Sequence, residues 1–398
     1  MAATFEHPFA ITMWDFSWLE RRWPGAGYEN WDLALDELVE RGYNAVRIDA
    51  YPHLVSADPY RNWELLPMWN QMSWGAQSPI SVQVLPALLE FIGKCRDRGV
   101  KVSLSSWYRE DRDNVRMNIR TPDDHARIWI DTIRHIENEG LLDSVLFVDL
   151  CNEFPLAAWA PYLYAAQSSS AIGEAKTPLE RLKTEAEREL SRTAPHVQAW
   201  MDESIATVRA QYPKLDYTYS FSSQLSSWRD QDVHSLDLLE PHLWMATAKG
   251  SDYFQTVGYE YARFESSSFD NLVANGRRVY EEKMDHWDRL LFRAIDDLAD
   301  WSRSTRLGLI TTEAWAVVDY KDWPGLDWDW VMELTEKGLR CAASTGRWIG
   351  LATSNFCGPQ FVGMWRDVAW HQRLTTLIKS SSIDSDVHTH LDEIRGLR

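Results

Sequence analysis

Two short stretches of sequence, each an apolar run that ends in a glutamate, decide the fold of this chain. Residues 144–153 read SVLFVDLCNE, and residues 307–313 read LGLITTE. Runs of this kind, rich in Val, Leu, Ile and Phe, are typical of strands that are buried on both faces of a parallel sheet. A helical pattern precedes each run, over residues 121–139 and 280–301, and Thr121 followed by Pro122 is a favourable helix start. Each stretch therefore predicts a strand that follows a helix.

The same alternation of strands and helices extends along most of the 398 residues. Further strands are expected at 9–14, 44–50, 100–107, 216–221, 235–243 and 348–353. Further helices are expected at 30–41, 82–98, 178–192, 196–211, 329–344 and 365–378. Parallel neighbours need a helix-length crossover, and eight such units favour a closed barrel over an open sheet. The sequence therefore predicts an α/β fold, a single-domain (β/α)8 TIM barrel with enlarged βα loops.

The extent of the barrel and its loops can also be predicted. The barrel is expected over residues 1–380, with a polar C-terminal tail over residues 381–398. Residues 154–176 read as an irregular excursion, and residues 250–275 resemble a long loop.

The composition limits which binding partners and which cellular compartment can be expected. The chain has 41 Lys and Arg against 59 Asp and Glu, a net charge of −18, so nucleic acid is not an expected partner. The four cysteines show no metal-binding spacing and read as free thiols. Neither a signal-peptide pattern nor a continuous apolar stretch of about 18 residues occurs, because the longest uncharged stretches, residues 65–89 and 154–173, are interrupted by polar residues and prolines. We expect a cytoplasmic protein that does not bind membranes, and the sequence leaves homo-oligomerisation open.

Tryptophan is unusually frequent, with 22 residues. Its large flat apolar face and single N–H donor suit the flat C–H faces and the hydroxyl groups of sugar rings. Most of these residues are expected to lie in the core. Four follow or end predicted strands and are candidate sugar platforms, namely Trp107, Trp244, Trp315 and, more weakly, Trp14.

Polar residues stand where the predicted strands end, which is where barrels of this type place their active sites. They are Arg47, Asp49, Asn152, Glu153, His242, Glu313 and Asn355. A carboxylate that emerges from a buried strand is costly unless it is paired or used. Glu153 and Glu313 follow the fourth and seventh strands, which face each other across a barrel mouth, and two facing carboxylates suit the cleavage of a glycosidic bond. Either glutamate alone could instead cap a helix or pair with an arginine.

Other motifs are weak. His388 and His390 have metal-like spacing but lie in the polar tail, and only Asp49 and His242 qualify as metal ligands at strand ends. No phosphate-binding glycine loop and no GxSxG nucleophile motif occurs. We therefore predict neither a metal nor a cofactor.

The Asn-Glu pair after the fourth strand and the glutamate after the seventh resemble glycoside hydrolase clan A, and within it the cellulase-like, family-five-like proteins. The resemblance covers roughly residues 8–378. It implies that Glu153 is the general acid/base and Glu313 the nucleophile. It also implies that Asn152 binds the sugar 2-hydroxyl and that Arg47 supports the nucleophile.

The chain departs from that pattern at three strand ends. Ser106 and Trp107 stand where a histidine is frequent, and Asn355 stands where a tryptophan is usual. His242 is present, but Trp244 replaces the usual tyrosine that hydrogen-bonds the nucleophile. These departures suggest an outlying family with its own specificity.

We therefore expect a retaining glycoside hydrolase that cleaves a small oligosaccharide or glycoside by a two-glutamate double displacement. Two alternatives stay open at this point, a non-catalytic sugar-binding barrel and a transglycosylase.

Overall fold

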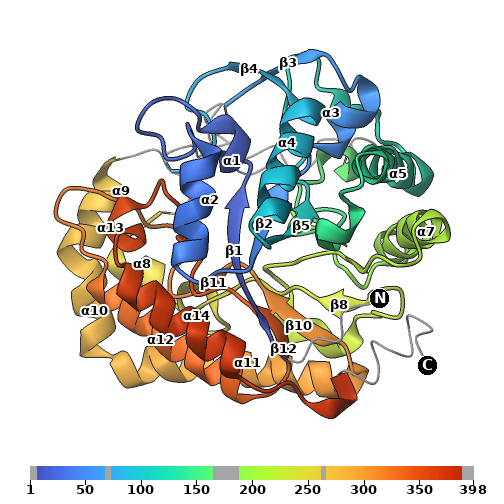
Figure 1. The fold of residues 1–398 in the computed structure, drawn as a ribbon. Coiled ribbons are helices and arrows are strands. Elements are labelled where there is room, and N and C mark those ends of the chain that lie inside the picture. The colour runs from blue at the N-terminus through green and yellow to red at the C-terminus, as the bar shows by residue number, and fades with distance from the viewer. Residues whose placement is uncertain (1–6, 68–72, 165–187, 261–265, 388–398) are drawn as a thin grey trace, which may run out of the picture. The chain divides into compact units, whose positions relative to one another are not determined.

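The computed structural model describes residues 7–67, 73–164, 188–260 and 266–387. The chain is a (β/α)8 barrel, as predicted (Figure 1). Eight strands form one sheet in the order β7-β6-β5-β2-β1-β12-β10-β8. Successive sheet strands of the chain are neighbours, except that β7 and β8 are the two ends of the order, and the first strand, β1, also neighbours the last, β12. Residues 1–14, 23–46 and 238–398 form a first compact unit, and residues 15–22 and 47–237 form a second.

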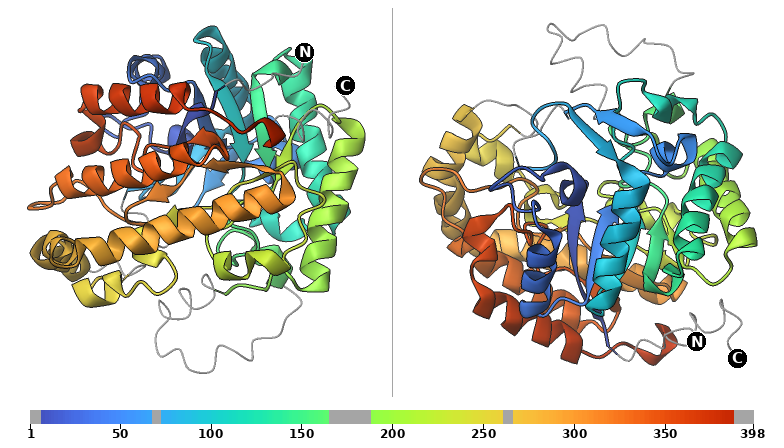
Figure 2. Two further views of the ribbon diagram at one scale, coloured as in Figure 1. Left: turned by 90° about the horizontal axis from the view of Figure 1, so that it is seen from below. Right: turned by 45° about the horizontal axis from the view of Figure 1, so that its top comes forward.

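The first unit contains the beginning and the end of the barrel. Its sheet strands are β1 (Phe9–Asp15), β8 (Leu238–Leu239), β10 (Gly308–Thr311) and β12 (Trp348–Leu351), and β12 pairs in parallel with both β1 and β10. Two short strands, β9 (Leu243–Trp244) and β11 (Ala314–Trp315), pair in parallel beyond β8 and β10. Its helices are α2 (Trp31–Glu40), α8 (Tyr253–Val257), α9 (Ser266–Asn271), α10 (Arg277–Glu282), α11 (Met284–Thr305), α12 (Asp329–Ser344), α13 (Val362–Trp365) and α14 (Val368–Ser380). Figures 1 and 2 show α11, α12 and α14 lying side by side.

The second unit contains the middle of the barrel. Its sheet strands are β2 (Ala45–Asp49), β5 (Lys101–Ser105), β6 (Val145–Asp149) and β7 (Tyr217–Thr218). The first two residues of β2, residues 45 and 46, are counted with the first unit. An antiparallel hairpin of β3 (Asn62–Leu65) and β4 (Ile80–Gln83) lies between β2 and β5 in the chain. Its helices are α1 (Ser17–Glu20), α3 (Pro52–Ala57), α4 (Val84–Asp97), α5 (Pro122–Asn138) and α7 (Pro195–Gln211), and α5 packs beside α7 (Figure 2).

Local signals in the sequence fix several helix boundaries. The side chain of Asn30 caps α2 by accepting hydrogen bonds from two backbone N–H groups, and Thr121 caps α5 in the same way. Gly42 follows α2 with a φ of 85°, a left-handed conformation that glycine adopts without strain. Helix α12 spans the predicted residues 329–344.

Other predicted elements need correction. Residues 250–275 are not simply a long loop, because they contain α8, α9 and most of a π-helical turn over Leu272–Gly276. Helices this short offer too few apolar positions to show a period in the sequence. Of the predicted helix at 178–192, residues 178–187 lie outside the described residues, and residues 188–192 are not helical.

The tail is described only up to residue 387, so most of the predicted polar tail, including His388 and His390, lies outside the described residues. Asp384 and Asp386 pair there with the buried Arg347. Tryptophan contributes much of the core, and seven of the largest fully buried side chains are Trp14, Trp18, Trp129, Trp287, Trp301, Trp315 and Trp348. Within the described part of the chain, no helix combines the length and apolar character that crossing a membrane requires.

Candidate active site

Non-glycine residues with left-handed backbone gather where strands of the second unit end. Tyr51, Tyr108 and Glu153 follow β2, β5 and β6, and their φ angles are 48°, 42° and 46°. Each backbone N–H is held by a buried side chain: Tyr51 N donates to Asp49 (2.7 Å), Tyr108 N to Ser106 (3.1 Å) and Glu153 N to Ser220 (2.9 Å). Residues in this region cost about 1–3 kcal/mol each, and such strain clusters at functional sites. The strand ends of this unit are therefore shaped for a task other than stability.

Glu153 is the partly exposed member of this group. Its carboxylate Oε2 accepts a hydrogen bond from Trp159 Nε1 at 3.1 Å. Behind it, Asn152 is buried, and its backbone N–H donates to the carbonyl of Ser106 at 2.9 Å. The surrounding structure thus fixes Glu153 while part of its side chain stays accessible.

Arg47 organises the buried layer beneath Glu153 in the second unit. Its Nη2 lies 2.5 Å from Asp149 Oδ2 and donates to Asn152 Oδ1 at 2.8 Å. Ser105 and Ser220 are further acceptors of the same nitrogen, at 3.0 and 3.2 Å. The guanidinium lies over the ring of Trp107, 4.6 Å from its centroid. Arg47 therefore orients Asn152 and Trp107, and its support of Glu313 stays a prediction.

The Asp49 side chain connects the segment that follows β2 with the segment that follows β5. Its carboxylate accepts hydrogen bonds from Tyr51 N and from Trp107 N, at 2.7 and 3.1 Å. The residue is 0% exposed, and burial raises the pKa of this carboxyl to about 7. The sequence suggested direct binding of substrate, but complete burial favours a role in positioning Trp107.

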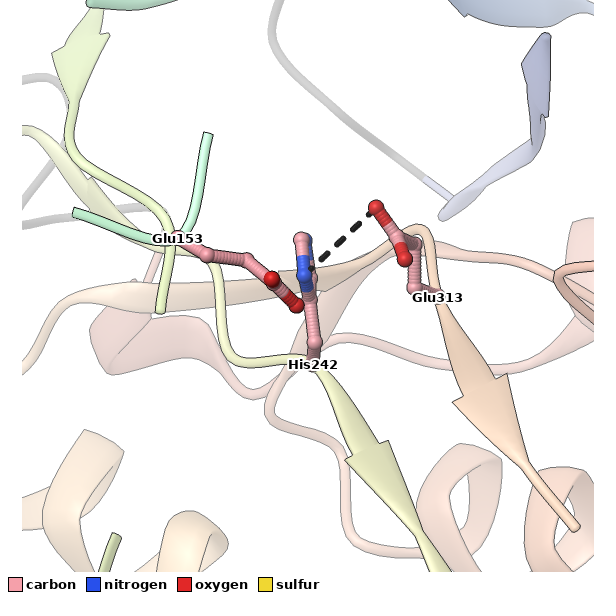
Figure 3. A group of neighbouring side chains, drawn as sticks. All are labelled: Glu153, His242 and Glu313. Atoms are coloured by element: carbon pink, nitrogen blue, oxygen red, sulfur yellow. Dashed lines mark ion pairs between the residues drawn. The ribbon is translucent and has the colours of Figure 1, made fainter. Parts of the chain in front are cut away.

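The strand ends of the first unit hold the second glutamate. Glu313 follows β10, and 12% of its side chain is exposed. Its Oε1 lies 3.5 Å from Nδ1 of His242, whose side chain is completely buried (Figure 3). The backbone carbonyl of Glu313 also accepts a hydrogen bond from Leu243 N at 3.1 Å, so β9 and β11 hold the two side chains in register.

Trp244 and Asn355, both predicted site residues, contact each other. Trp244 Nε1 donates to Asn355 Oδ1 at 3.3 Å, and Asn355 Nδ2 donates to the carbonyl of Val318 at 3.2 Å. Their exposed fractions are only 3% and 2%. Because Trp244 Nε1 donates to Asn355, the indole N–H is not available to a ligand in this structure, and direct substrate binding by the pair stays a prediction.

Two of the four predicted sugar platforms lie in the core. Trp315 is fully buried, donates to the carbonyl of Ala352 at 3.0 Å and packs against α12, where a Cβ added to Gly338 would lie 2.8 Å from its own Cβ. Trp14 is also fully buried and donates to the carbonyl of Cys357 at 3.1 Å. Both rings are fully buried in the described structure, which does not support a sugar-stacking role, and that role stays a prediction for both.

Glu240 is a buried acidic residue near Glu313 that the sequence analysis missed. It follows β8 directly, is 0% exposed, and its Oε1 accepts a hydrogen bond from Thr312 Oγ1 at 2.8 Å. The same oxygen lies 3.9 Å from Nε2 of His242. The spacing of two residues between Glu240 and His242 was a usable signal, because residues i and i+2 of an extended chain point to the same side.

The strand-end residues also include ligand types of divalent metals. Glu153, His242 and Glu313, drawn in Figure 3, offer carboxylate oxygens and an imidazole nitrogen. The absence of a metal from the reaction therefore stays a prediction.

Comparison with known proteins identifies the family. Residues 11–379 match the family described as cellulase-like, sugar-binding. A solved structure from Parabacteroides distasonis, provisionally described as a glycoside hydrolase, shares 46% identity over 98% of this chain and 99% of that chain, with a TM-score of 0.89. The endo-β-1,4-mannanase from Thermotoga petrophila is similar in fold alone, with 10% identity over 94% of this chain and 77% of that chain and a TM-score of 0.51. No curated protein matches the sequence. This chain belongs to the sugar-binding cellulase-like family.

Proposed function

We propose that this protein is a retaining glycoside hydrolase, with Glu153 as general acid/base and Glu313 as nucleophile. One observation carries the proposal: each glutamate follows a barrel strand and keeps part of its side chain accessible, whereas the groups that hold it, Ser220 behind Glu153 and His242 behind Glu313, are buried. The carboxyl ends of barrel strands are where enzymes of this fold place their catalytic groups. The relative from P. distasonis, provisionally described as a glycoside hydrolase, supports the coarser part of the proposal, hydrolysis of a glycosidic bond.

In the first step, a carboxylate oxygen of Glu313 attacks the anomeric carbon of the sugar. The glycosidic C–O bond breaks, and the leaving oxygen takes the proton of Glu153. The product is a glycosyl ester on Glu313 and an ionised Glu153. A protonated His242, whose Nδ1 lies 3.5 Å from Oε1 of Glu313, would favour the ionised form of Glu313 that this attack requires.

In the second step, Glu153 takes a proton from a water molecule, whose oxygen attacks the same anomeric carbon. The ester bond breaks, Glu313 leaves as a carboxylate, and the sugar keeps its original configuration. Retention requires the two carboxyl groups to lie about 5–5.5 Å apart when substrate is bound.

We propose a small oligosaccharide or glycoside as the substrate. The chain inserts long segments after β6 and after β8, and loops at this end of a barrel shape the substrate pocket. Enlarged loops favour a pocket that takes a short sugar chain over an open groove for a polymer.

A panel of aryl glycosides, assayed with the wild-type protein and with Glu153→Ala and Glu313→Ala, tests the proposal. Glu282→Ala is the matched control, because Glu282 is an exposed glutamate paired with Arg278 on α10. We expect the control to hydrolyse the substrates that the wild type hydrolyses, and Glu313→Ala to lose turnover. Activity that disappears with EDTA and returns with a divalent metal would contradict the mechanism.

The description of the family as sugar-binding keeps the non-catalytic alternative testable. Calorimetry with the sugars of the same panel distinguishes an enzyme from a non-catalytic sugar-binding protein. A sugar that binds the wild type without any turnover, across the whole panel, would favour a binding protein over an enzyme.

A further inference from the structure

A buried carboxylate lies behind His242, and the two-glutamate reaction does not account for it. Glu240 is completely buried, and Thr312 Oγ1 donates a hydrogen bond to its Oε1. The burial of an ionised carboxylate is costly unless hydrogen bonds and an opposite charge compensate for the lost hydration. A positive charge on His242, whose Nε2 lies 3.9 Å from the same oxygen, would supply that compensation.

The imidazole of His242 lies between two carboxylates. Its Nε2 faces Glu240 Oε1, and its Nδ1 faces Glu313 Oε1 at 3.5 Å. Only the protonated imidazole can donate from both ring nitrogens. Each nearby negative charge stabilises the protonated form, so two ionised carboxylates on opposite edges of the ring favour the imidazolium.

The charge on Glu240 has a consequence for Glu313. When Glu240 is ionised, its negative charge 3.9 Å from Nε2 of His242 favours a proton on that nitrogen. A neutral imidazole would then present the lone pair of Nδ1 to Glu313, an arrangement that suits only a protonated Glu313. A protonated Glu313 cannot attack an anomeric carbon, so the imidazolium is the form that matches the reaction.

We propose that Glu240 is a positioning residue that keeps His242 as an imidazolium and thereby keeps Glu313 ionised and oriented. The proposal rests on the function proposed above for Glu313, but the charge on His242 can be measured without any substrate. Glu240 differs from both catalytic glutamates because it is sealed from solvent and held by Thr312.

The test is NMR of the ¹⁵N-histidine-labelled full chain at neutral pH, with the His242 resonances assigned by their loss in His242→Gln. We expect the wild type to show the imidazolium signature. In Glu240→Gln, which keeps an oxygen to accept from Thr312 but has no charge, the ratio of imidazolium to neutral imidazole should fall about 10-fold or more. Glu240→Asp, which keeps the negative charge, should restore part of the imidazolium population of His242.

Glu20→Gln is the matched control. Glu20 is also fully buried and ion-paired, with Arg109 Nε at 2.7 Å, in the second unit. The Glu20→Gln substitution removes a buried carboxylate charge of the same kind, and the His242 resonances of this variant should stay as in the wild type. On a substrate that the wild type hydrolyses, Glu240→Gln should lower kcat about 10-fold or more while KM changes less, because the loss falls on the nucleophile and not on binding.

The outcomes separate this proposal from the proposed function. A neutral His242 in the wild type at neutral pH overturns the inference without any variant at position 240. The inference is also overturned if the Glu240→Gln variant keeps both the imidazolium form of His242 and the wild-type kcat. If the imidazolium responds as expected but the wild type hydrolyses no glycoside, the proposed function fails and the electrostatic link between Glu240 and His242 stands.

Discussion

His242 Nδ1 lies 3.5 Å from Oε1 of Glu313, and the histidine side chain is completely buried whereas the glutamate side chain keeps 12% of its surface exposed. The orienting side chain, His242, is therefore buried, and the carboxylate proposed to react, Glu313, stays partly exposed to solvent. The second unit repeats this arrangement around Glu153, which is partly exposed, accepts from Trp159 Nε1 and is anchored through its backbone by the buried Ser220. Carboxylates of this kind are expected of a working site and not of a structural ion pair.

Glu153→Ala should separate substrates by their leaving groups. An alkyl glycoside needs the proton of Glu153, so its kcat should fall by about 10²–10⁴-fold. An aryl glycoside with a good leaving group needs little acid help, and its first step should survive. Stopped-flow measurement of leaving-group release gives the rate of that step, and azide should accelerate the second step and yield a product of retained configuration. Equal losses on both kinds of substrate would show that Glu153 has another role.

Asp49 makes the stability of the protein depend on pH. Burial raises the pKa of Asp49 to about 7 from an ordinary value of 3.8, so between these two values the folded state holds a proton that the unfolded chain has lost. The contribution of Asp49 to the free energy of unfolding is therefore full below about pH 4 and is lost as the pH rises towards about 7. The loss is on the order of 1 kcal/mol per pH unit.

Asp49→Asn removes this titration and keeps one of the two acceptor oxygens, Oδ1 for Tyr51 N or Oδ2 for Trp107 N, so the lost hydrogen bond should lower stability by a similar amount at every pH. Urea unfolding at several pH values should therefore show a smaller decline of stability with pH in the variant than in the wild type. The difference between the two proteins isolates Asp49 from the other acidic residues. Parallel curves would mean that Asp49 is already ionised in the folded protein at low pH.

Trp107 and Trp244 are the predicted sugar platforms that are not completely buried, and for Trp107 the sugar-stacking role stays a prediction. Trp107 follows β5, its ring lies over the buried Arg47, and 3% of the residue is exposed. Trp107→Ala should weaken the binding of a sugar ligand by roughly 1–2 kcal/mol, as measured by calorimetry on the folded variant. Trp107→Phe, which keeps an aromatic face, should lose less. Unchanged affinity in Trp107→Ala would place the ring outside the binding site.

Trp315 should behave as a core residue. Trp315→Ala opens a cavity between β11 and α12, and we expect a loss of about 3–5 kcal/mol in the free energy of unfolding. Gly338→Ala addresses the same contact from the helix, because the new Cβ would lie 2.8 Å from Trp315 Cβ. Overpacking there should cost about 1–3 kcal/mol. Denaturant unfolding measures both, and wild-type stability in either variant would contradict the packing described above.

Much of the fold could be predicted because its signals are local. Thr121 and Pro122 mark the start of α5, Asn30 and Gly42 bound α2, and the apolar runs at β6 and β10 are too short and too rich in β-branched and other apolar residues to be helices. The same runs place Glu153 and Glu313 at strand ends, which is why the candidate pair could be found without a structure.

The environment of a side chain is set by distant residues and could not be predicted. Trp315 follows its strand in the way that a platform would, but β11 continues that strand and turns the ring towards Gly338 of α12. Glu240 ends a weak strand and resembles an ordinary surface glutamate until Thr312, 72 residues later, is seen to bind it in the interior. Burial and pairing between neighbouring strand ends therefore determine which strand-end residues stay accessible to a substrate and which are enclosed.

The most direct test of the central claim is to trap the covalent intermediate. A 2-deoxy-2-fluoro glycoside with a good leaving group slows the second step more than the first, so the glycosyl ester accumulates and can be located by mass spectrometry of proteolytic peptides. The account predicts one sugar per protein chain, attached to Glu313, and no label in Glu313→Ala. A label on a different residue, or an inverted product formed without any covalent intermediate, would contradict it.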